Sequence, residues 1–324
     1  MPPSFLTSVC GNPTGITMTP PASEARPPLR TAIGCLAVLL VLSACAGPTR
    51  IIAFGDVHGD LAATRAALRL AGAIDEEDHW VGRRLVVVQT GDQLDRGNDE
   101  RAILDLFDRL RDEAAAAGGA FHPLLGNHEL MNVRGDLRYV TESGFSDFGD
   151  AVDFDPEDPA LASFEPRARS RMAAFLPGRP YALRLARRDV ILKVEDNVFV
   201  HGGVLPVHVA HGVDRINGET RAWLRGEVGR PAVLQGSESP QWTRLYSSEP
   251  DSLACATLGQ VLESMDAKRM IMGHTVQDGG IRSACDGLAW LIDVGLSERY
   301  GGPLEVLEIV GDSVRVMKPE PVRR

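Results

Sequence analysis

Residues 91–97, Gly-Asp-Gln-Leu-Asp-Arg-Gly, combine two carboxylates with one guanidinium in a short glycine-bounded segment. The segment follows an apolar run at 85–88, which is short, β-branched and typical of a buried strand. A carboxylate that leaves the end of such a strand points into a cleft, so Asp92 is a candidate ligand that bridges two cations. Asp95 and Arg96 add a second carboxylate and a fixed cation that can hold two oxygens of an oxyanion. Alone, the pattern fits an ordinary turn with a surface ion pair equally well.

Four other apolar runs also end with a glycine close to Asp, Asn or His. These runs lie at 50–54, 120–125, 198–200 and 270–272, and the polar residues that follow them are Asp56, His58, Asn127, His128, His201 and His274. Ligands of α/β sheets bind at the carboxyl ends of the strands. We therefore expect these side chains to gather at one site that binds metal ions.

His128 differs from the expected ligands because it is adjacent to Asn127 and points elsewhere. Its expected role is that of a general acid, held by a carboxylate such as Asp95. The alternative is a histidine at a helix start that is satisfied by the backbone. Two further histidines, His208 and His211, lack the strand-and-glycine pattern, and we interpret them as surface or structural residues, with support of His201 as the alternative.

The order of five motifs resembles the signature of the calcineurin-like metallophosphoesterases: GDVHGD at 55–60, GDQLDRG at 91–97, GNHE at 126–129, HGG at 201–203 and GHT at 273–275. The DRG and GNHE motifs are similar to those of the phosphoprotein phosphatase branch, and residues 131–140 are similar to the bacterial Shewanella-like protein phosphatases. The resemblance implies an α/β protein with the calcineurin-like four-layer fold, in which two mixed β-sheets are flanked by helices.

The resemblance also implies two divalent metal ions. The first would be held by Asp56, His58 and Asp92, and the second by Asp92, Asn127, His201 and His274. Mixed oxygen and nitrogen ligands suit manganese, iron or zinc better than magnesium or calcium, and the family implies manganese, with iron or zinc as alternatives.

The implied reaction is the hydrolysis of a phosphomonoester by direct attack of a metal-bridging hydroxide. Arg96 would hold the phosphoryl oxygens, and His128, oriented by Asp95, would protonate the leaving group. A second phosphate-binding arginine is expected between the HGG and GHT motifs. Arg244 is preferred because its Trp-Thr-Arg-Leu-Tyr context resembles the Shewanella-like branch, while Arg221 is the other candidate. Either arginine could instead pair with a local acid.

The expected substrates are phosphorylated protein side chains, with phosphoserine or phosphothreonine and phosphotyrosine all open, or a small phosphate ester. A dinucleoside polyphosphate hydrolase or a broad-specificity phosphoesterase would use the same residues. A non-catalytic binding module of the cell envelope is less expected because all six ligand positions are filled. Tyr246 is either a residue that stacks on substrate or part of the core.

The composition and net charge of the chain indicate which classes of partner to expect. The 324 residues are 44% hydrophobic, enough for a full core, and carry a formal net charge of −10. Residues 1–44 contribute +1, so the remainder carries −11. Nucleic acid is therefore not an expected partner, because its phosphates require a basic surface. The sequence leaves the oligomeric state open.

The N-terminal segment predicts export. An apolar run at 33–42 follows Arg26 and Arg30 and is typical of a signal peptide, here assigned to residues 1–44. It ends in Leu-Ser-Ala-Cys, which resembles the bacterial lipoprotein cleavage box with Cys45 as the lipidated residue. We therefore expect a periplasmic lipoprotein anchored to a membrane, with the outer membrane favoured because Ala46 follows the cysteine. A plain secretory signal is the alternative.

The rest of the chain is expected to form one domain over residues 50–318, after a linker at 45–49. Insertions are expected near 144–180, interpreted as solvated rather than as a lid, and near 204–265. Residues 303–318 predict a closing hairpin. Cys255 and Cys285 are the two cysteines left after the signal and Cys45, and in an oxidising compartment they suggest a disulfide. Two separate buried thiols are the alternative.

Overall fold

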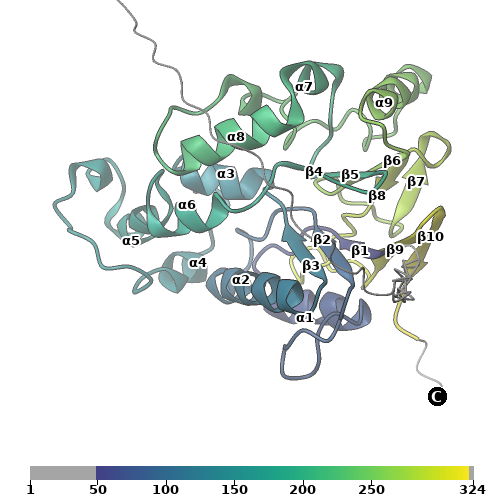
Figure 1. The fold of residues 1–324 in the computed structure, drawn as a ribbon. Coiled ribbons are helices and arrows are strands. Elements are labelled where there is room, and N and C mark those ends of the chain that lie inside the picture. The colour runs from purple at the N-terminus through teal and green to yellow at the C-terminus, as the bar shows by residue number, and fades with distance from the viewer. Residues whose placement is uncertain (1–48, 321–324) are drawn as a thin grey trace, which may run out of the picture. The chain divides into compact units, whose positions relative to one another are not determined.

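Two five-stranded β-sheets lie at the centre of the protein (Figure 1). The computed structural model describes residues 49–320. The regular elements of these residues run from Arg50 to Met317. The expected signal peptide and Cys45 lie outside the described residues. Within residues 49–320, no helix combines the length and the apolar character needed to span a bilayer.

The first sheet has the order β10-β9-β1-β2-β3. Its strands are β1 (Arg50–Phe54), β2 (Val86–Gln89), β3 (Ala120–Pro123), β9 (Val306–Val310) and β10 (Ser313–Met317). The first three strands are parallel and are connected by two helices, α1 (Leu61–Leu70) and α2 (Glu100–Ala116). The last two form the antiparallel hairpin that the sequence predicted, with Gly311 in the left-handed conformation at its turn. In this sheet the carboxyl ends of β1, β2 and β3 therefore meet at one edge.

The second sheet has the order β4-β5-β6-β8-β7. Its strands are β4 (Ile191–Val194), β5 (Asn197–Val200), β6 (Arg269–Met272), β7 (Arg282–Ala284) and β8 (Ala289–Leu291). The three central strands β5, β6 and β8 are parallel, and each edge strand is antiparallel to its neighbour. Both sheets are thus mixed, as expected, and each contributes three parallel strand ends to the molecule.

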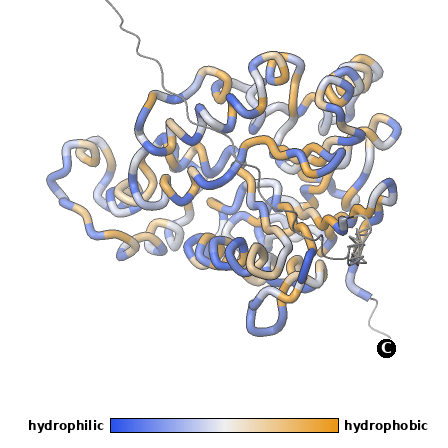
Figure 2. Tube along the Cα trace, viewed as in Figure 1, coloured by the Kyte–Doolittle hydropathy of each residue, from blue (hydrophilic) through white to orange (hydrophobic). Residues whose placement is uncertain are grey.

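The alternation of side chains along the strands defines the layers. Phe199 in β5 and Ile271 in β6 belong to the core that includes β1 and β2 of the first sheet. Their neighbours Val198 and Met270 belong to a second core, formed with the helices on the other face of the second sheet. Successive strand residues face opposite sides of a sheet, so the order is helices, sheet, sheet, helices. The strands are the most apolar part of the trace in Figure 2.

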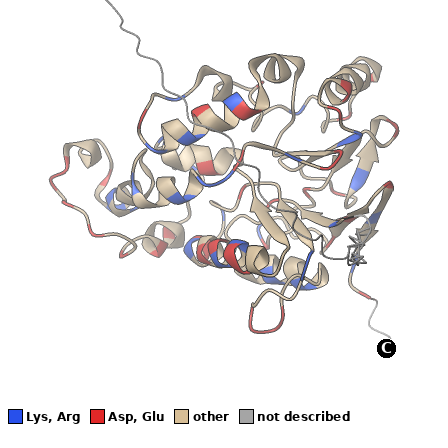
Figure 3. Cartoon of the chain, in the orientation of Figure 1, with Lys and Arg blue, Asp and Glu red and all other residues tan. Residues whose placement is uncertain are grey.

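The helices that follow β3 in the chain come largely from the two expected insertions. They are α3 (Asn127–Val133), α4 (Glu142–Asp147), α5 (Pro166–Phe175), α6 (Pro180–Leu185), α7 (Pro206–His211), α8 (Val213–Leu224) and α9 (Ser252–Ser264), with 3₁₀ turns η1 (Pro159–Leu161), η2 (Ala232–Leu234) and η3 (Cys285–Gly287). The interpretation of 144–180 as a solvated insertion holds only for the charged, mostly exposed stretch before α5 (Figure 3). Helix α5 itself is half buried, and Met172 and Phe175 are fully enclosed.

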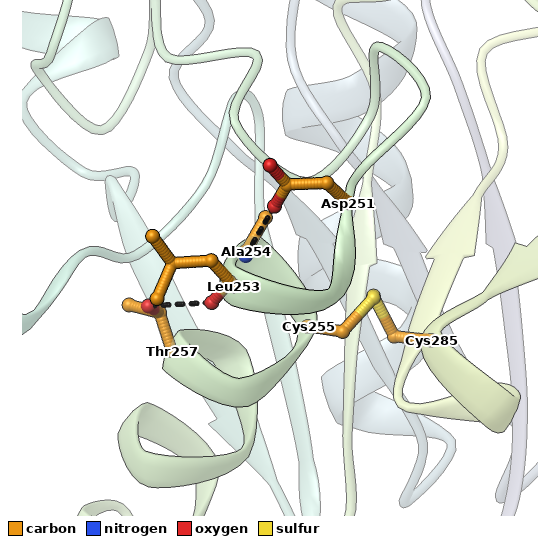
Figure 4. Close-up of a disulfide and its surroundings, with 6 residues drawn as sticks. All are labelled: Asp251, Leu253, Ala254, Cys255, Thr257 and Cys285. Atoms are coloured by element: carbon orange, nitrogen blue, oxygen red, sulfur yellow. Dashed lines mark hydrogen bonds between the residues drawn. A yellow bond between two sulfur atoms is a disulfide. The ribbon is translucent and has the colours of Figure 1, made fainter.

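A disulfide between Cys255 and Cys285 connects α9 to the turn before β8 (Figure 4). Helix α9 begins after Asp251, whose carboxylate accepts the backbone N–H of Ala254 at 2.8 Å. The bond closes a loop with a sequence separation of 30. The sequence showed only that two cysteines were left over, and the fold decides that they are close enough to pair.

Candidate dinuclear metal centre

The six expected ligands lie together where the strands of both sheets end. Asp56 and His58 follow β1, Asp92 follows β2, and Asn127 follows β3. From the second sheet, His201 follows β5 and His274 follows β6. All six side chains are buried, with at most 8% of any residue exposed. The structure therefore brings the expected ligand set into one enclosed site.

Glu129 holds the loops after β2 and β3 together. Its carboxylate accepts backbone N–H groups from Gly126 at 2.7 Å and Asp92 at 2.9 Å, and from Gln93 at 2.8 Å and Leu94 at 3.2 Å. The sequence analysis quoted this residue within GNHE but assigned it no role. The available signal was the glutamate three residues after the helix N-cap, which is the spacing of a capping box.

Five site residues that are not glycine adopt the left-handed backbone conformation. They are His58, Asp92, Asp95, Arg96 and His274, with φ between 42° and 69°. Such conformations are rare outside glycine and concentrate at functional sites, where the surrounding structure holds them in place. The bends after β1, β2 and β6 thus turn the side chains into the cleft.

Two glycines beside the ligands leave room for the carboxylates of Asp56 and Asp92. A Cβ atom on Gly126 would lie 2.1 Å from Oδ1 of Asp92, and one on Gly273 would lie 2.5 Å from Oδ1 of Asp56. Both distances are far below van der Waals contact, and the carboxylates would have to move. The glycines that mark the strand ends in the sequence therefore leave space for the carboxylates.

The first expected ligand group, Asp56, His58 and Asp92, has its donor atoms turned toward one another. The Nε2 atom of His58 is 3.9 Å from a carboxylate oxygen of each aspartate. The other ring nitrogen, Nδ1, lies 3.1 Å from the carbonyl oxygen of Leu94 and donates its proton there, so the Nε2 lone pair faces the site. Burial lowers the pKa of His58 to about 3, which keeps the ring neutral, as metal ligation requires.

The second expected group is centred on His201. Its Nε2 atom is 2.9 Å from Oδ1 of Asn127 and 3.2 Å from Oδ2 of Asp92, while its Nδ1 atom donates to the carbonyl oxygen of Thr90 at 2.9 Å. Asp92, His201 and His274 each offer a donor atom within 4.8 Å of the others. Burial lowers the pKa of His274 to about 2. Asp92 faces both groups and is placed to bridge two cations.

A third buried carboxylate, Asp293, lies beside the ligands and was missed by the sequence analysis. It follows β8 and lines the same pocket. Burial, with the charge of Asp92 adding to it, raises the pKa of Asp293 to about 6, and burial with the charges of Asp293 and Asp92 raises the pKa of Asp56. Asp293 was predictable from the sequence, because the apolar run 289–292 is followed by Asp293 and Gly295, the same pattern that follows the other strands.

These mutually repelling carboxylates and neutral imidazoles form a donor set that fits divalent cations. Buried carboxylates are costly unless they are paired or coordinate metal. Oxygen and nitrogen donors together match the preferences of manganese, iron and zinc. The residues present therefore fit the two-metal site that the sequence implied.

His128 lies at the edge of the site and is held by Asp95. Its Nδ1 atom is 2.6 Å from Oδ2 of Asp95, and its backbone N–H donates to Oδ1 of Asp92 at 2.9 Å. Burial would lower the pKa of His128, but the nearby carboxylates of Asp92 and Asp95 outweigh it and raise the pKa overall. His58, Asp92 and His128 also each offer one donor atom within 4.8 Å of the other two, which is close enough for the three residues to share one metal ion. The carboxylate partner of His128 stabilises the protonated ring, and a protonated imidazole cannot ligate metal.

Asp95 is held in turn by a buried network that reaches into α5. Asn132 donates to Oδ1 of Asp95 at 3.0 Å, and Glu100 accepts the backbone N–H of Asp95 at 2.7 Å. Arg171 is fully buried, forms an ion pair with Glu100, donates to Asn132 at 2.7 Å and places Nη2 3.5 Å from Asp95. The expected insertion thus supplies a cation to the carboxylate that orients His128. This contact was not predictable from local sequence patterns, because 76 positions separate Arg171 from Asp95.

The ligands open into a pocket of about 220 Å³. Arg96 and Arg244 both line this pocket, as do the aromatic residues Tyr139, Trp242 and Tyr300. The guanidinium of Arg96 contacts two aromatic rings, with its Cζ atom 4.9 Å from the centroid of Tyr139 and 5.3 Å from that of Tyr300. The pocket therefore presents two arginines to an anion that enters above the buried carboxylates.

Arg221, the second candidate for phosphate binding, is not brought to the pocket. It lies on α8, and its Nη1 atom is 3.1 Å from Oδ1 of Asp189, the local ion pair that was the alternative. Tyr246 is fully buried in the core and cannot stack on substrate. His208 and His211 line a separate depression, so they do not support His201.

Residues 49–278 match the calcineurin-like phosphoesterase family. The chain is 41% identical over 308 residues to Shewanella-like protein phosphatase 2 of Arabidopsis thaliana, covering 85% of this chain and 79% of the relative. It is 30% identical over 270 residues to Shewanella-like protein phosphatase 1 of Plasmodium berghei, covering 78% of this chain and 69% of the relative.

A similar solved structure is that of the cold-active protein tyrosine phosphatase of a psychrophilic Shewanella species. Its TM-score is 0.64 at 24% identity, over 84% of this chain and 81% of that chain. This likeness confirms the expected four-layer fold. The fold, the site and the sequence relatives together define the class: the chain belongs to the calcineurin-like phosphoesterases, in the branch of the Shewanella-like protein phosphatases. It is accordingly a metal-dependent phosphoesterase.

Proposed function

We propose that the protein hydrolyses phosphomonoesters on protein side chains. The observation that carries this proposal is the combination, in one pocket, of buried ligands for two cations, two arginines and a histidine held by a carboxylate. The names of the relatives from Arabidopsis and Plasmodium support a protein substrate. The pocket mouth supports it too, because Tyr139 and Tyr300 are 39% and 40% exposed and leave room for an attached polypeptide.

In the proposed reaction, Arg96 and Arg244 bind the phosphoryl oxygens and hold phosphorus above the buried carboxylates. Their charge stabilises the negative charge that accumulates in the transition state. Two divalent metal ions bound by the buried ligand set would supply Lewis-acid polarisation of the phosphoryl group and activate water. Manganese is the proposed metal, with iron or zinc as alternatives, because the donors are mixed oxygen and nitrogen.

His128 is the proposed general acid. Asp95 accepts a hydrogen bond from Nδ1–H of His128 at 2.6 Å, which leaves the protonated Nε2 free to donate to the departing oxygen. The residue that loses phosphate then leaves as a neutral alcohol or phenol. No covalent phosphoenzyme is required in this scheme.

Initial rates test the substrate class. The purified protein, reconstituted with manganese, is assayed on matched phosphotyrosine, phosphothreonine and phosphoserine peptides beside a dinucleoside tetraphosphate. Turnover of any peptide well above the nucleotide supports the proposal, and the order of the peptides identifies the preferred side chain. Turnover of the nucleotide alone would overturn the substrate class and leave the metal site intact.

We also infer that the protein acts outside the cytoplasm as a lipoprotein. The cleavage box ending at Cys45 supports lipidation, and the disulfide between Cys255 and Cys285 supports an oxidising compartment. The test is cell fractionation of Cys45→Ser: release from the membrane fraction is expected. Retention of the variant in the membrane would contradict the lipid anchor.

A further inference from the structure

A second hollow opens beside the catalytic pocket and shares one wall with it. The shared wall consists of Arg96, Tyr139 and Tyr300. The hollow measures about 380 Å³, and we call it the flanking groove; its other lining residues are Arg138, Val140, Thr141 and Arg299. Because the wall is common to both, the groove offers a path for the residues that neighbour a side chain bound in the catalytic pocket.

The flanking groove is positively charged although the protein is acidic. Its lining contains three arginines, Arg96, Arg138 and Arg299, and no carboxylate, whereas the chain as a whole carries −10. The side chain of Arg299 is exposed and forms no ion pair or hydrogen bond with any residue in the range 49–320. An arginine without an acidic partner at the mouth of a site is available to an incoming anion.

Arg138 adds to this charge although it has an acidic neighbour. Its guanidinium donates to both oxygens of Asp136 at 2.8 Å. The same carboxylate also accepts from Arg134 at 2.6 Å, so two arginines share one negative charge and the trio retains +1. The segment before Tyr139 therefore holds Arg138 in place without neutralising it.

The aromatic rings position the cationic wall. Tyr139 and Tyr300 both contact the guanidinium of Arg96, whose Cζ atom lies 4.9 Å and 5.3 Å from the two ring centroids. The exposed parts of the two rings provide apolar surface between the catalytic pocket and the outer arginines. An extended peptide advances about 3.3 Å per residue, so the outer arginines correspond to positions close to the phosphorylated one.

We propose that the flanking groove binds an acidic side chain, aspartate or glutamate, that lies within a few residues of the phosphorylated residue in the substrate. The planar guanidinium groups of Arg138 and Arg299 match the two oxygens of a carboxylate. Arginine clusters are a recurrent means of recognising acidic motifs. This inference rests on the proposed phosphoprotein substrate and specifies its sequence context.

The test compares three phosphopeptides that differ only in the residues flanking the phosphorylated one, which are glutamate, alanine or lysine. Exposed ion pairs contribute about 0.2 to 1 kcal/mol each, which corresponds to a factor of up to about five per pair. We therefore expect kcat/KM for the glutamate peptide to exceed that for the alanine peptide by about three- to tenfold at low salt. The lysine peptide should be the poorest substrate, and the ratio should fall at high salt.

Substitutions in the flanking groove test which arginines cause the preference for the glutamate peptide. Arg138→Ala and Arg299→Ala should each reduce the glutamate-to-alanine ratio, and the double variant should bring it close to one. The matched control is Arg225→Ala, which removes an exposed arginine at the end of α8 that lines neither pocket. Its ratio should equal that of the wild type. The use of a ratio cancels any general loss of activity in a variant.

The outcomes separate this inference from the proposed function. Equal turnover of the glutamate and alanine peptides, or a ratio that survives in the double variant, would overturn the flanking groove as an acidic subsite while the phosphopeptide phosphatase stands. Failure to hydrolyse any of the peptides, with p-nitrophenyl phosphate still hydrolysed, would instead overturn the protein substrate and the inference with it.

Discussion

Replacing Arg171 with methionine tests whether α5 supports the catalytic histidine. Arg171 is fully enclosed, forms an ion pair with Glu100 and places Nη2 3.5 Å from Asp95. Methionine retains much of the side-chain volume against Phe148 and Phe175 but leaves the buried carboxylate of Glu100 without its cation and removes one of the two cations beside Asp95. Breaking a buried ion pair from one side costs about 3 to 5 kcal/mol. We expect the free energy of unfolding to fall by that amount.

A second substitution distinguishes lost charge from lost packing. In Arg171→Met with Glu100→Gln, the unpaired charge of Glu100 is removed as well, and the oxygen of the new amide can still accept the backbone N–H of Asp95. The double variant should therefore recover about 1 to 3 kcal/mol relative to the single variant, because residues in one network do not act additively. The measurement is urea unfolding followed by tryptophan fluorescence. Arg169→Met is the control on the same helix, since within residues 49–320 the Arg169 side chain makes a single hydrogen bond, to the carbonyl oxygen of Phe164.

The same variant has a kinetic signature that lost stability alone does not produce. If Arg171 positions Asp95 and thereby His128, its loss should weaken proton donation to the leaving group. The kcat for an alkyl phosphate, which has a poor leaving group, should then fall about 10- to 100-fold more than the kcat for p-nitrophenyl phosphate, because misplacing the acid loses part of the roughly 10²- to 10⁴-fold that general acid catalysis supplies. Equal losses on both esters, or an unfolding free energy within about 1 kcal/mol of the wild type, would refute the reasoning.

Four further predictions follow from the site and the fold. His128→Asn should lower kcat for alkyl phosphates by about 10²- to 10⁴-fold with the metal content, measured by mass spectrometry, unchanged; a wild-type rate would exclude the acid role. Chelation of metal should abolish activity, manganese should restore it, and the melting temperature should rise with manganese concentration because the buried carboxylates gain cations; an unchanged melting temperature would argue against the site. Arg244→Ala should raise KM about tenfold through loss of a charged hydrogen bond, whereas Arg221→Ala should leave KM within about twofold; the reverse order would exchange their roles. Replacing both Cys255 and Cys285 with alanine should lower the free energy of unfolding by about 3 to 4 kcal/mol, from the loop separation of 30, without loss of activity on p-nitrophenyl phosphate; wild-type stability on urea unfolding would contradict the estimate.

Local sequence patterns were sufficient to locate the strands and the ligands that follow them. Each of the five apolar runs that precede the expected ligands is a strand in the structure, with shifts of at most two residues at the ends. The reason is local, because a buried strand and the bend after it depend on neighbouring residues. Parallel strands of one sheet then bring their carboxyl ends to one edge, so residues such as Asp56 and Asp92 lie close together although they are far apart in sequence. Asp293 followed the same rule and was predictable.

Only the tertiary structure decided which distant side chains serve that site. Both Arg221 and Arg244 satisfied the expected spacing, and only the packing of α8 shows that Arg221 pairs with Asp189 instead. Likewise, a charged insertion in the sequence does not show that Arg171 is enclosed against Asp95. Such a contact depends on the burial of opposite charges from separate elements, and burial is set by the packing of the whole domain. The sequence by itself thus determined the chemistry of the site, and the three-dimensional packing determined its supporting residues and its charged surroundings.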